Sequence, residues 1–127
     1  AVQTLGKLEP SALEKHAATI VAKLKDSDAD VRYVAVRTLG KLKPAVLEKH
    51  AAAIVAKLED SNVDVRIMAV QTLGKLEPSA LEKHAAAIVA KLEDSHEGVR
   101  IAAVRTLGKL ERAALETLRA CAFALRR

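Results

Sequence analysis

A repeat of 34 residues, the spacing between Gly6, Gly40, Gly74 and Gly108, is the feature that most constrains the fold of this chain. The segment VRYVAVRTLGKL, which begins at Val31, returns twice with few changes, and the chain opens with its truncated form AVQTLGKL. A fixed period of this length is typical of solenoids, in which each unit packs mainly against its neighbours. The unit of folding is therefore the repeat.

The apolar residues of the first half of each repeat predict a helix. In the first full unit, Leu13, Ala17, Ile20 and Leu24 recur at helical spacing and form one apolar stripe. Pro10 precedes them and suits the first turn of a helix, where its missing amide proton costs no hydrogen bond. We therefore expect a single helix that starts near this proline in each unit.

A turn and a second helix follow. The segment DSDAD at residues 26–30 contains short polar side chains that favour a turn, and Asp30 is the predicted cap of the second helix. In the third unit Gly98 stands at that capping position. Gly40 falls inside the expected second helix, where glycine is unfavourable, and so predicts the close approach of a neighbouring helix.

The expected fold is all-α, a solenoid of helical hairpins with a period of 34 residues. The C-terminal segment departs from the pattern because Arg112 replaces the proline, and we expect it to form a separate capping helix in which Cys121 is a buried thiol on the apolar stripe. The predicted parts are a half repeat at 1–9, repeats at 10–43, 44–77 and 78–111, and the capping helix at 112–127.

Composition limits the cellular setting. The single cysteine excludes an internal disulfide, which favours a reducing compartment, so we expect a cytoplasmic protein. Neither a signal peptide nor an apolar run long enough for a membrane span is recognisable. Of the net charge of +5, residues 112–127 contribute +3 through four arginines and one glutamate. The excess charge therefore lies mostly in the last segment.

The motif LxDxxxxVRxxAVxTLGKL, carried by Asp26, Val31, Arg32, Leu39 and Gly40 in the first full unit, resembles HEAT repeats, especially the short HEAT-like repeats of phycobilisome lyase-type proteins. The resemblance covers essentially all of residues 1–111, although HEAT units usually exceed 34 residues. Tetratricopeptide repeats have this period but carry aromatic residues that the chain lacks, since its aromatic content is 2%.

The resemblance implies a right-handed superhelix of the armadillo type, with the second helices on the concave surface where protein partners bind. It also implies a ladder of aspartate and arginine along the solenoid. The matching residues are Asp26 with Arg32, Asp60 with Arg66, and Asp94 with Arg100.

Comparison of the units with one another predicts the partner-binding surface. Most columns are identical, whereas the start of the second helix varies, with apolar residues that can act as anchors and with lysine and arginine nearby that favour an acidic partner. The predicted binding residues are Tyr33, Val34, Arg37, Ile67, Met68, Gln71, Ile101 and Arg105.

The histidine column gives no metal site. His16, His50 and His84 recur once per unit, but adjacent helices pack about 8–10 Å apart, whereas zinc requires ligand nitrogens at about 2 Å. We therefore expect no metal, no cofactor, no catalytic residue and no enzymatic activity. The expected function is a non-catalytic scaffold that binds a protein or peptide.

Two alternatives remain open at this stage. Nucleic-acid binding is the first, through phosphate contacts of the lysine column Lys7, Lys41, Lys75 and Lys109 together with the arginines. Self-association is the second, as a homodimer through the apolar flank of the half repeat at 2–8, in a fragment that is natural or built from a consensus.

Overall fold

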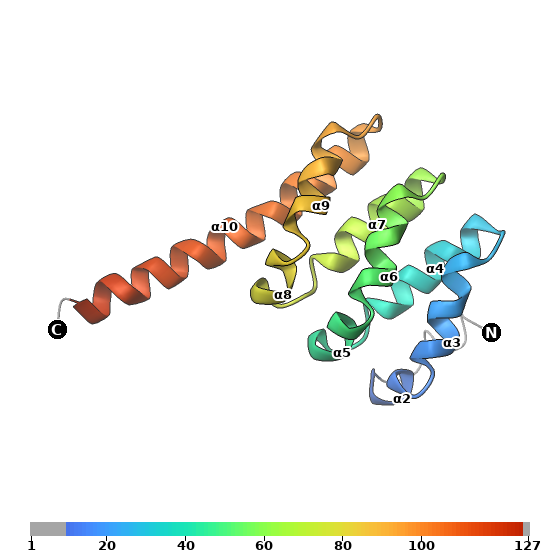
Figure 1. Ribbon diagram of the computed structural model, residues 1–127, viewed down its shortest axis with the longest axis horizontal. Helices are drawn as coiled ribbons and strands as arrows, with labels where there is room; N and C mark the ends of the chain where they lie inside the picture. Colours follow the sequence, from blue (N-terminus) through green and yellow to red (C-terminus); the bar gives the residue numbers. More distant parts are fainter. Residues whose placement is uncertain (1–9, 126–127) are drawn as a thin grey trace.

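The computed structural model describes residues 10–125 of the 127-residue chain. The predicted half repeat, Lys7 and the apolar flank at 2–8 lie outside the described residues. Figure 1 shows helix pairs that stand side by side in chain order, followed by one long helix that extends beyond them. No strand occurs within residues 10–125, and the predicted all-α solenoid is confirmed.

Each unit contains two short helices, a 3-10 turn and a longer helix. The first unit has α2 (Pro10–Glu14), α3 (Ala17–Ala22), a turn at Lys23–Lys25 and α4 (Ala29–Leu39). The second has α5 (Pro44–Lys49), α6 (Ala51–Ala56), a turn at Lys57–Glu59 and α7 (Val63–Leu73). The third has α8 (Pro78–Glu82), α9 (Ala85–Ala90), a turn at Lys91–Glu93 and α10 (Glu97–Leu125).

The first half of each unit is broken at its histidine, whereas the periodicity predicted one helix. At His50, φ is −111° and ψ is 7°, outside the helical range, and His16 and His84 have nearly the same backbone. Leu13 and Ile20, on either side of the first break, are both fully buried. The apolar pattern therefore identified the buried face correctly but not the interruption of the helix.

The predicted cap of the second helix is wrong by two residues. Asp28 Oδ1 accepts a hydrogen bond of 2.8 Å from the Asp30 amide, so Asp28 caps α4. Asn62 caps α7 in the same way, and His96 Nδ1 accepts from the Gly98 amide at 2.9 Å at the start of α10. The third unit therefore has a capping side chain, although glycine stands where we expected the cap.

The second helices pack directly on one another. Along the layer α4–α7–α10, each helix contacts the next, and the apolar side chains between them, such as Leu39 and Leu73, are fully buried. Gly40 lies at the end of α4 and not inside it, and a methyl group there would meet Lys75 Nζ at 3.2 Å and the Thr72 methyl at 3.4 Å. The predicted close approach at this glycine is confirmed.

The C-terminal segment does not form a separate capping helix. The helix α10 runs without a break for 29 residues, or about 43 Å, because Arg112 is compatible with a helix where the earlier units have a proline. Its C-terminal part extends away from the other helices (Figure 1). Its Leu118 is 64% exposed, and Cys121 is exposed too, so the expected burial of the thiol is wrong.

Replacing Thr72 with valine should stabilise the protein by about 1 kcal/mol. The Thr72 hydroxyl is buried and has no hydrogen-bond partner within residues 10–125, so valine of nearly equal volume removes a desolvated polar group. Thr106 is the matched control, since its hydroxyl donates to the Val70 carbonyl at 3.5 Å and Thr106→Val loses that bond. Urea denaturation measures both, and an equal or larger gain from Thr106→Val would contradict this account.

Candidate functional site

An arginine–aspartate ladder holds successive units in register. Arg32 donates from Nε and Nη2 to both carboxylate oxygens of Asp60, at 2.9 and 3.1 Å, and Arg66 binds Asp94 in the same way. Within its own unit, Arg32 Nη1 donates to the Asp26 backbone carbonyl at 2.8 Å. The charged pairs therefore join one unit to the next. Asp26 and Arg32, which the motif pairs within one unit, are joined only by the hydrogen bond from the arginine to the aspartate backbone carbonyl.

The ladder lowers the pKa of its carboxylates. Burial acts to raise the pKa of Asp60, but the hydrogen bonds from Arg32 and from the Asn62 amide, with the charges of Arg32 and Lys57, outweigh it. The pKa of Asp94 is lowered by the corresponding bonds from His96 and Arg66, again against the effect of burial. Both carboxylates therefore remain ionised at neutral pH, and the ladder is a structural element.

The lysine column also contacts neighbouring units. Lys109 Nζ donates to the Gly74 carbonyl at 3.2 Å, at the end of α7, and Lys75 Nζ lies close to Gly40 at the end of α4. A cation at the end of a helix stabilises the free carbonyl groups there. The ammonium groups of Lys75 and Lys109 thus lie against the protein itself. This weakens the hypothesis that the lysine column binds the phosphates of a nucleic acid.

A groove between α4 and α7 brings together residues from two units. Its volume is about 450 Å³. Four of the predicted binding residues line it: Tyr33, Ile67, Met68 and Gln71. The other lining residues are Ala29, Asp30, Asn62 and Asp64.

The sequence comparison missed the acidic side of this groove. Asp30 and Asp64 are exposed and are the charged residues among those that line it. The expected preference for an acidic partner came from lysine and arginine on the same helices, but none of these lines the groove. Asp30 and Asp64 lie one repeat apart, and each stands four residues before a varying apolar position. Residues four apart lie on the same face of a helix, so this spacing was the available sign that the two acids belong to the groove.

The remaining predicted binding residues lie elsewhere. Val34 is partly buried and packs against the core, whereas the guanidinium of Arg37 lies over the Tyr33 ring at 5.7 Å. Ile101 and Arg105 are exposed on α10, outside the groove. Only part of the predicted surface therefore forms one hollow.

Metal sites and membrane-spanning helices are two further features that bear on function. Among residues 10–125, no three His, Cys, Asp or Glu side chains are grouped closely enough to hold a metal ion. Within the same range, no helix has both the length and the apolar character needed to cross a membrane.

Comparison with known families decides what the repeated units are. The family model described as HEAT repeats matches residues 17–92 and, in a second register, residues 51–123. The chain belongs to the HEAT-repeat family. No curated protein matched the sequence. HEAT repeats generally mediate protein–protein interactions.

Proposed function

We propose that this protein is a non-catalytic HEAT-repeat scaffold that binds a protein segment in the groove between α4 and α7. The observation that carries the proposal is that this groove is lined by columns that differ between the units, including Tyr33, Ile67 and Met68. Constant columns build most of the core and the ladder, so a hollow lined by varying columns is where a specific contact can be made.

The lining residues define the chemistry of the partner. Tyr33, Ile67 and Met68 are partly buried and offer apolar contact, and methionine adapts to partner side chains of different shapes. Asp30 and Asp64, in the first turns of α4 and α7, add negative charge to the groove. The proposed partner segment therefore carries an apolar side chain next to a lysine or arginine, which gives electrostatic complementarity at the groove.

A selection of random peptides on the wild-type protein tests this proposal. Enriched peptides should combine an apolar residue with a basic one, and the double substitution Tyr33→Ala and Ile67→Ala should weaken their binding at least about tenfold, because the apolar contact is lost. Asp64→Asn should weaken binding and reduce its dependence on salt. Fluorescence anisotropy with the selected peptides measures both effects.

The exposed Leu115, far along α10, supplies the control for this experiment. Leu115→Ala removes a comparable apolar group outside the groove and should leave peptide binding unchanged. Equal losses from Leu115→Ala and from the groove variants, or selected peptides that are acidic, would refute the assignment of the groove.

Oligonucleotide binding to the same protein tests the nucleic-acid alternative. Binding through phosphates would weaken steeply with salt and would be lost on replacing exposed arginines such as Arg37 and Arg105. Oligonucleotide binding at about 50 mM salt that exceeds peptide binding would overturn the scaffold proposal in favour of this alternative.

A further inference from the structure

Gly98 is a position at which the third unit departs from the other two. Its equivalents are Asp30 and Asp64, the two acids that line the groove between α4 and α7. Gly98 lies in the first turn of α10, and no glycine within residues 10–125 has a positive φ, so its backbone conformation is open to residues with a side chain. The reason for glycine at this position therefore has to lie in the space around it.

The space beside Gly98 is taken by a side chain of the groove. A methyl group on Gly98 would lie 2.9 Å from Ile67 Cδ1 on α7, which is closer than real methyl groups approach, and 3.1 Å from Cε1 and Nδ1 of His96. At the preceding boundary the corresponding positions are Tyr33 and Asp64, which both line the groove. Ile67 therefore leans onto α10 at the place where Asp64 carries a side chain on α7.

Ile67 contacts two different surfaces. It lines the groove together with Tyr33 and Met68, and its Cδ1 lies over the backbone of α10 at Gly98. The helix α7 packs between α4 and α10 (Figure 1). A side chain on residue 98 would therefore push the Ile67 methyl group away from α10. The side of α7 that remains is the one that carries the groove.

We propose that Gly98 is a positioning residue for the groove: because it has no side chain, Ile67 rests on α10 and leaves the hollow beside Tyr33 open for the apolar side chain of the partner. The consequence for binding rests on the proposed function of the groove, whereas the position of Ile67 does not. Gly98 also ends the acidic column of Asp30 and Asp64. A partner that needs both the hollow and the acids therefore binds between α4 and α7 and not between α7 and α10.

Methyl NMR tests the position of Ile67 without any partner. In the wild type, the Ile67 δ1 methyl protons should show a nuclear Overhauser effect to the α protons of Gly98, because the two groups are in contact. In Gly98→Ala the δ1 methyl signal should shift and gain an effect to the Tyr33 ring. Gly108→Ala is the control, since its methyl group would meet no atom of the described structure within 4 Å and should leave the Ile67 signals unchanged.

Binding of the selected peptides measures the consequence for the groove. Gly98→Ala should weaken binding at least about tenfold, since the displaced Ile67 fills space that the partner's side chain needs. Ile67→Val removes the Cδ1 methyl group that meets residue 98 and should by itself weaken binding only slightly. In the Ile67→Val background, Gly98→Ala should cause no further loss, because the two substitutions act through the same atom. Circular dichroism shows that each variant is folded.

His96 needs a control of its own because its ring also borders Gly98. Its Nδ1 accepts from the Gly98 amide at 2.9 Å, so a methyl group there also presses on the cap of α10. His96→Asn introduces the cap of the second unit, where Asn62 tolerates the side chain of Asp64. Gly98→Ala should still weaken peptide binding in the His96→Asn background. A loss that disappears there would overturn the proposal, since the histidine and not Ile67 would carry the effect.

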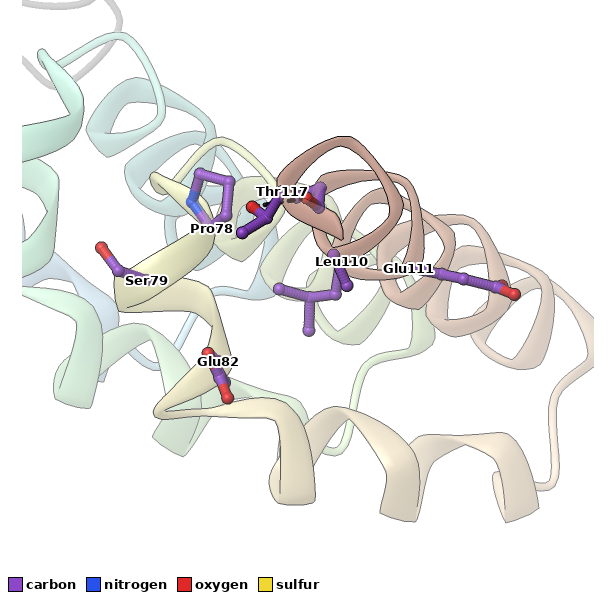
Figure 2. A pocket seen from close by; sticks show the side chains of 8 residues that line it. Pro78, Ser79, Glu82, Leu110, Glu111 and Thr117 are labelled. Atoms are coloured by element: carbon purple, nitrogen blue, oxygen red, sulfur yellow. Dashed lines mark hydrogen bonds between the residues drawn. The ribbon is translucent and has the colours of Figure 1, made fainter. Parts of the chain in front are cut away.

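A second hollow, between α8 and α10, provides a control for the place of binding (Figure 2). Its volume is about 610 Å³, and Glu82 and Leu110 are among the residues that line it. Glu82→Arg reverses a charge there and should leave peptide binding unchanged. A loss with Glu82→Arg and none with Gly98→Ala would place the peptide in this hollow. That result would overturn both the proposed function of the groove and the part of Gly98 in it.

The remaining outcomes separate the two proposals. Failure to select any peptide would contradict the proposed function, while the methyl spectra would still decide whether Gly98 positions Ile67. An Ile67 methyl group that stays in place in Gly98→Ala would overturn the positioning. Displacement of this methyl group without a change in peptide affinity would show that the groove does not depend on Gly98.

Discussion

Replacing Leu73 with alanine is expected to lower the free energy of unfolding by about 3 kcal/mol. Leu73 is fully buried on α7, the helix that contacts both α4 and α10, so the substitution removes transfer free energy and leaves a cavity between the layers. The loss is a large fraction of the total stability of about 5–15 kcal/mol that domains of this size have. Urea denaturation followed by circular dichroism measures it.

Leu107 is the matched control for this substitution. It occupies the same repeat position on α10 but is only partly buried, because within residues 10–125 no further unit follows α10. In dilute solution Leu107→Ala should therefore cost clearly less than Leu73→Ala. Equal costs in dilute protein would mean that Leu107 is covered as completely as Leu73, in contradiction to the described structure.

Replacing Asp60 with alanine is expected to cost about 2–3 kcal/mol at neutral pH. Its carboxylate accepts two hydrogen bonds from Arg32 and one of 2.9 Å from the Asn62 amide, and charged hydrogen bonds of this kind are lost together. Removing one partner of a nearly buried pair also leaves the other charge uncompensated. Chemical denaturation at pH 7 measures the loss.

Asp26 provides the control, because it has the same local hydrogen bond without the ion pair. Its carboxylate accepts from the Asp28 amide at 2.9 Å, as that of Asp60 does from Asn62, but it meets no guanidinium within residues 10–125. Asp26→Ala should therefore cost under about 1 kcal/mol, the value of a helix or turn cap. If both substitutions cost the same, the ion pair between units contributes nothing to stability.

The effect of Asp60 should also depend on pH with a definite sign. Because its pKa in the folded protein is lower than the ordinary value of 3.8, the unfolded chain takes up this proton first as the pH falls. The stability from the ladder is complete above pH values near 3.8 and is lost as the pH falls through the folded pKa. The difference between wild type and Asp60→Ala should therefore shrink in acid, and a constant difference would argue against the ladder.

The sequence reached the repeat architecture because each unit has a strong local pattern. Leu13, Ile20 and their equivalents were assigned to the buried face from helical spacing alone, and Gly40 was assigned to a close approach from the cost of glycine in a helix. These features depend on neighbours in the chain or on a fixed period. Both can be recognised from the amino-acid sequence alone.

The wrong predictions concern where the helices begin, break and end. The break at His50 has no proline or glycine to mark it, and the cap shifted from Asp30 to Asp28 within a run of residues that all favour capping. Arg112 replaces the proline that follows the second helix in the earlier units, but only the structure shows that α10 then continues to residue 125. Local preferences were too similar to decide these points.

The sequence by itself determined the period, the all-α class, the buried columns and the variable columns, since all of these are repeated one-dimensional patterns. Tertiary structure decided which residues of different units meet. It paired Arg32 with Asp60 rather than with the Asp26 carboxylate, and it placed Tyr33 and Ile67 in one acidic groove. It also left Val104 uncovered where Val70 is buried. Identical motifs differ in burial and charge pairing because those properties depend on the neighbouring unit, which the motif does not contain.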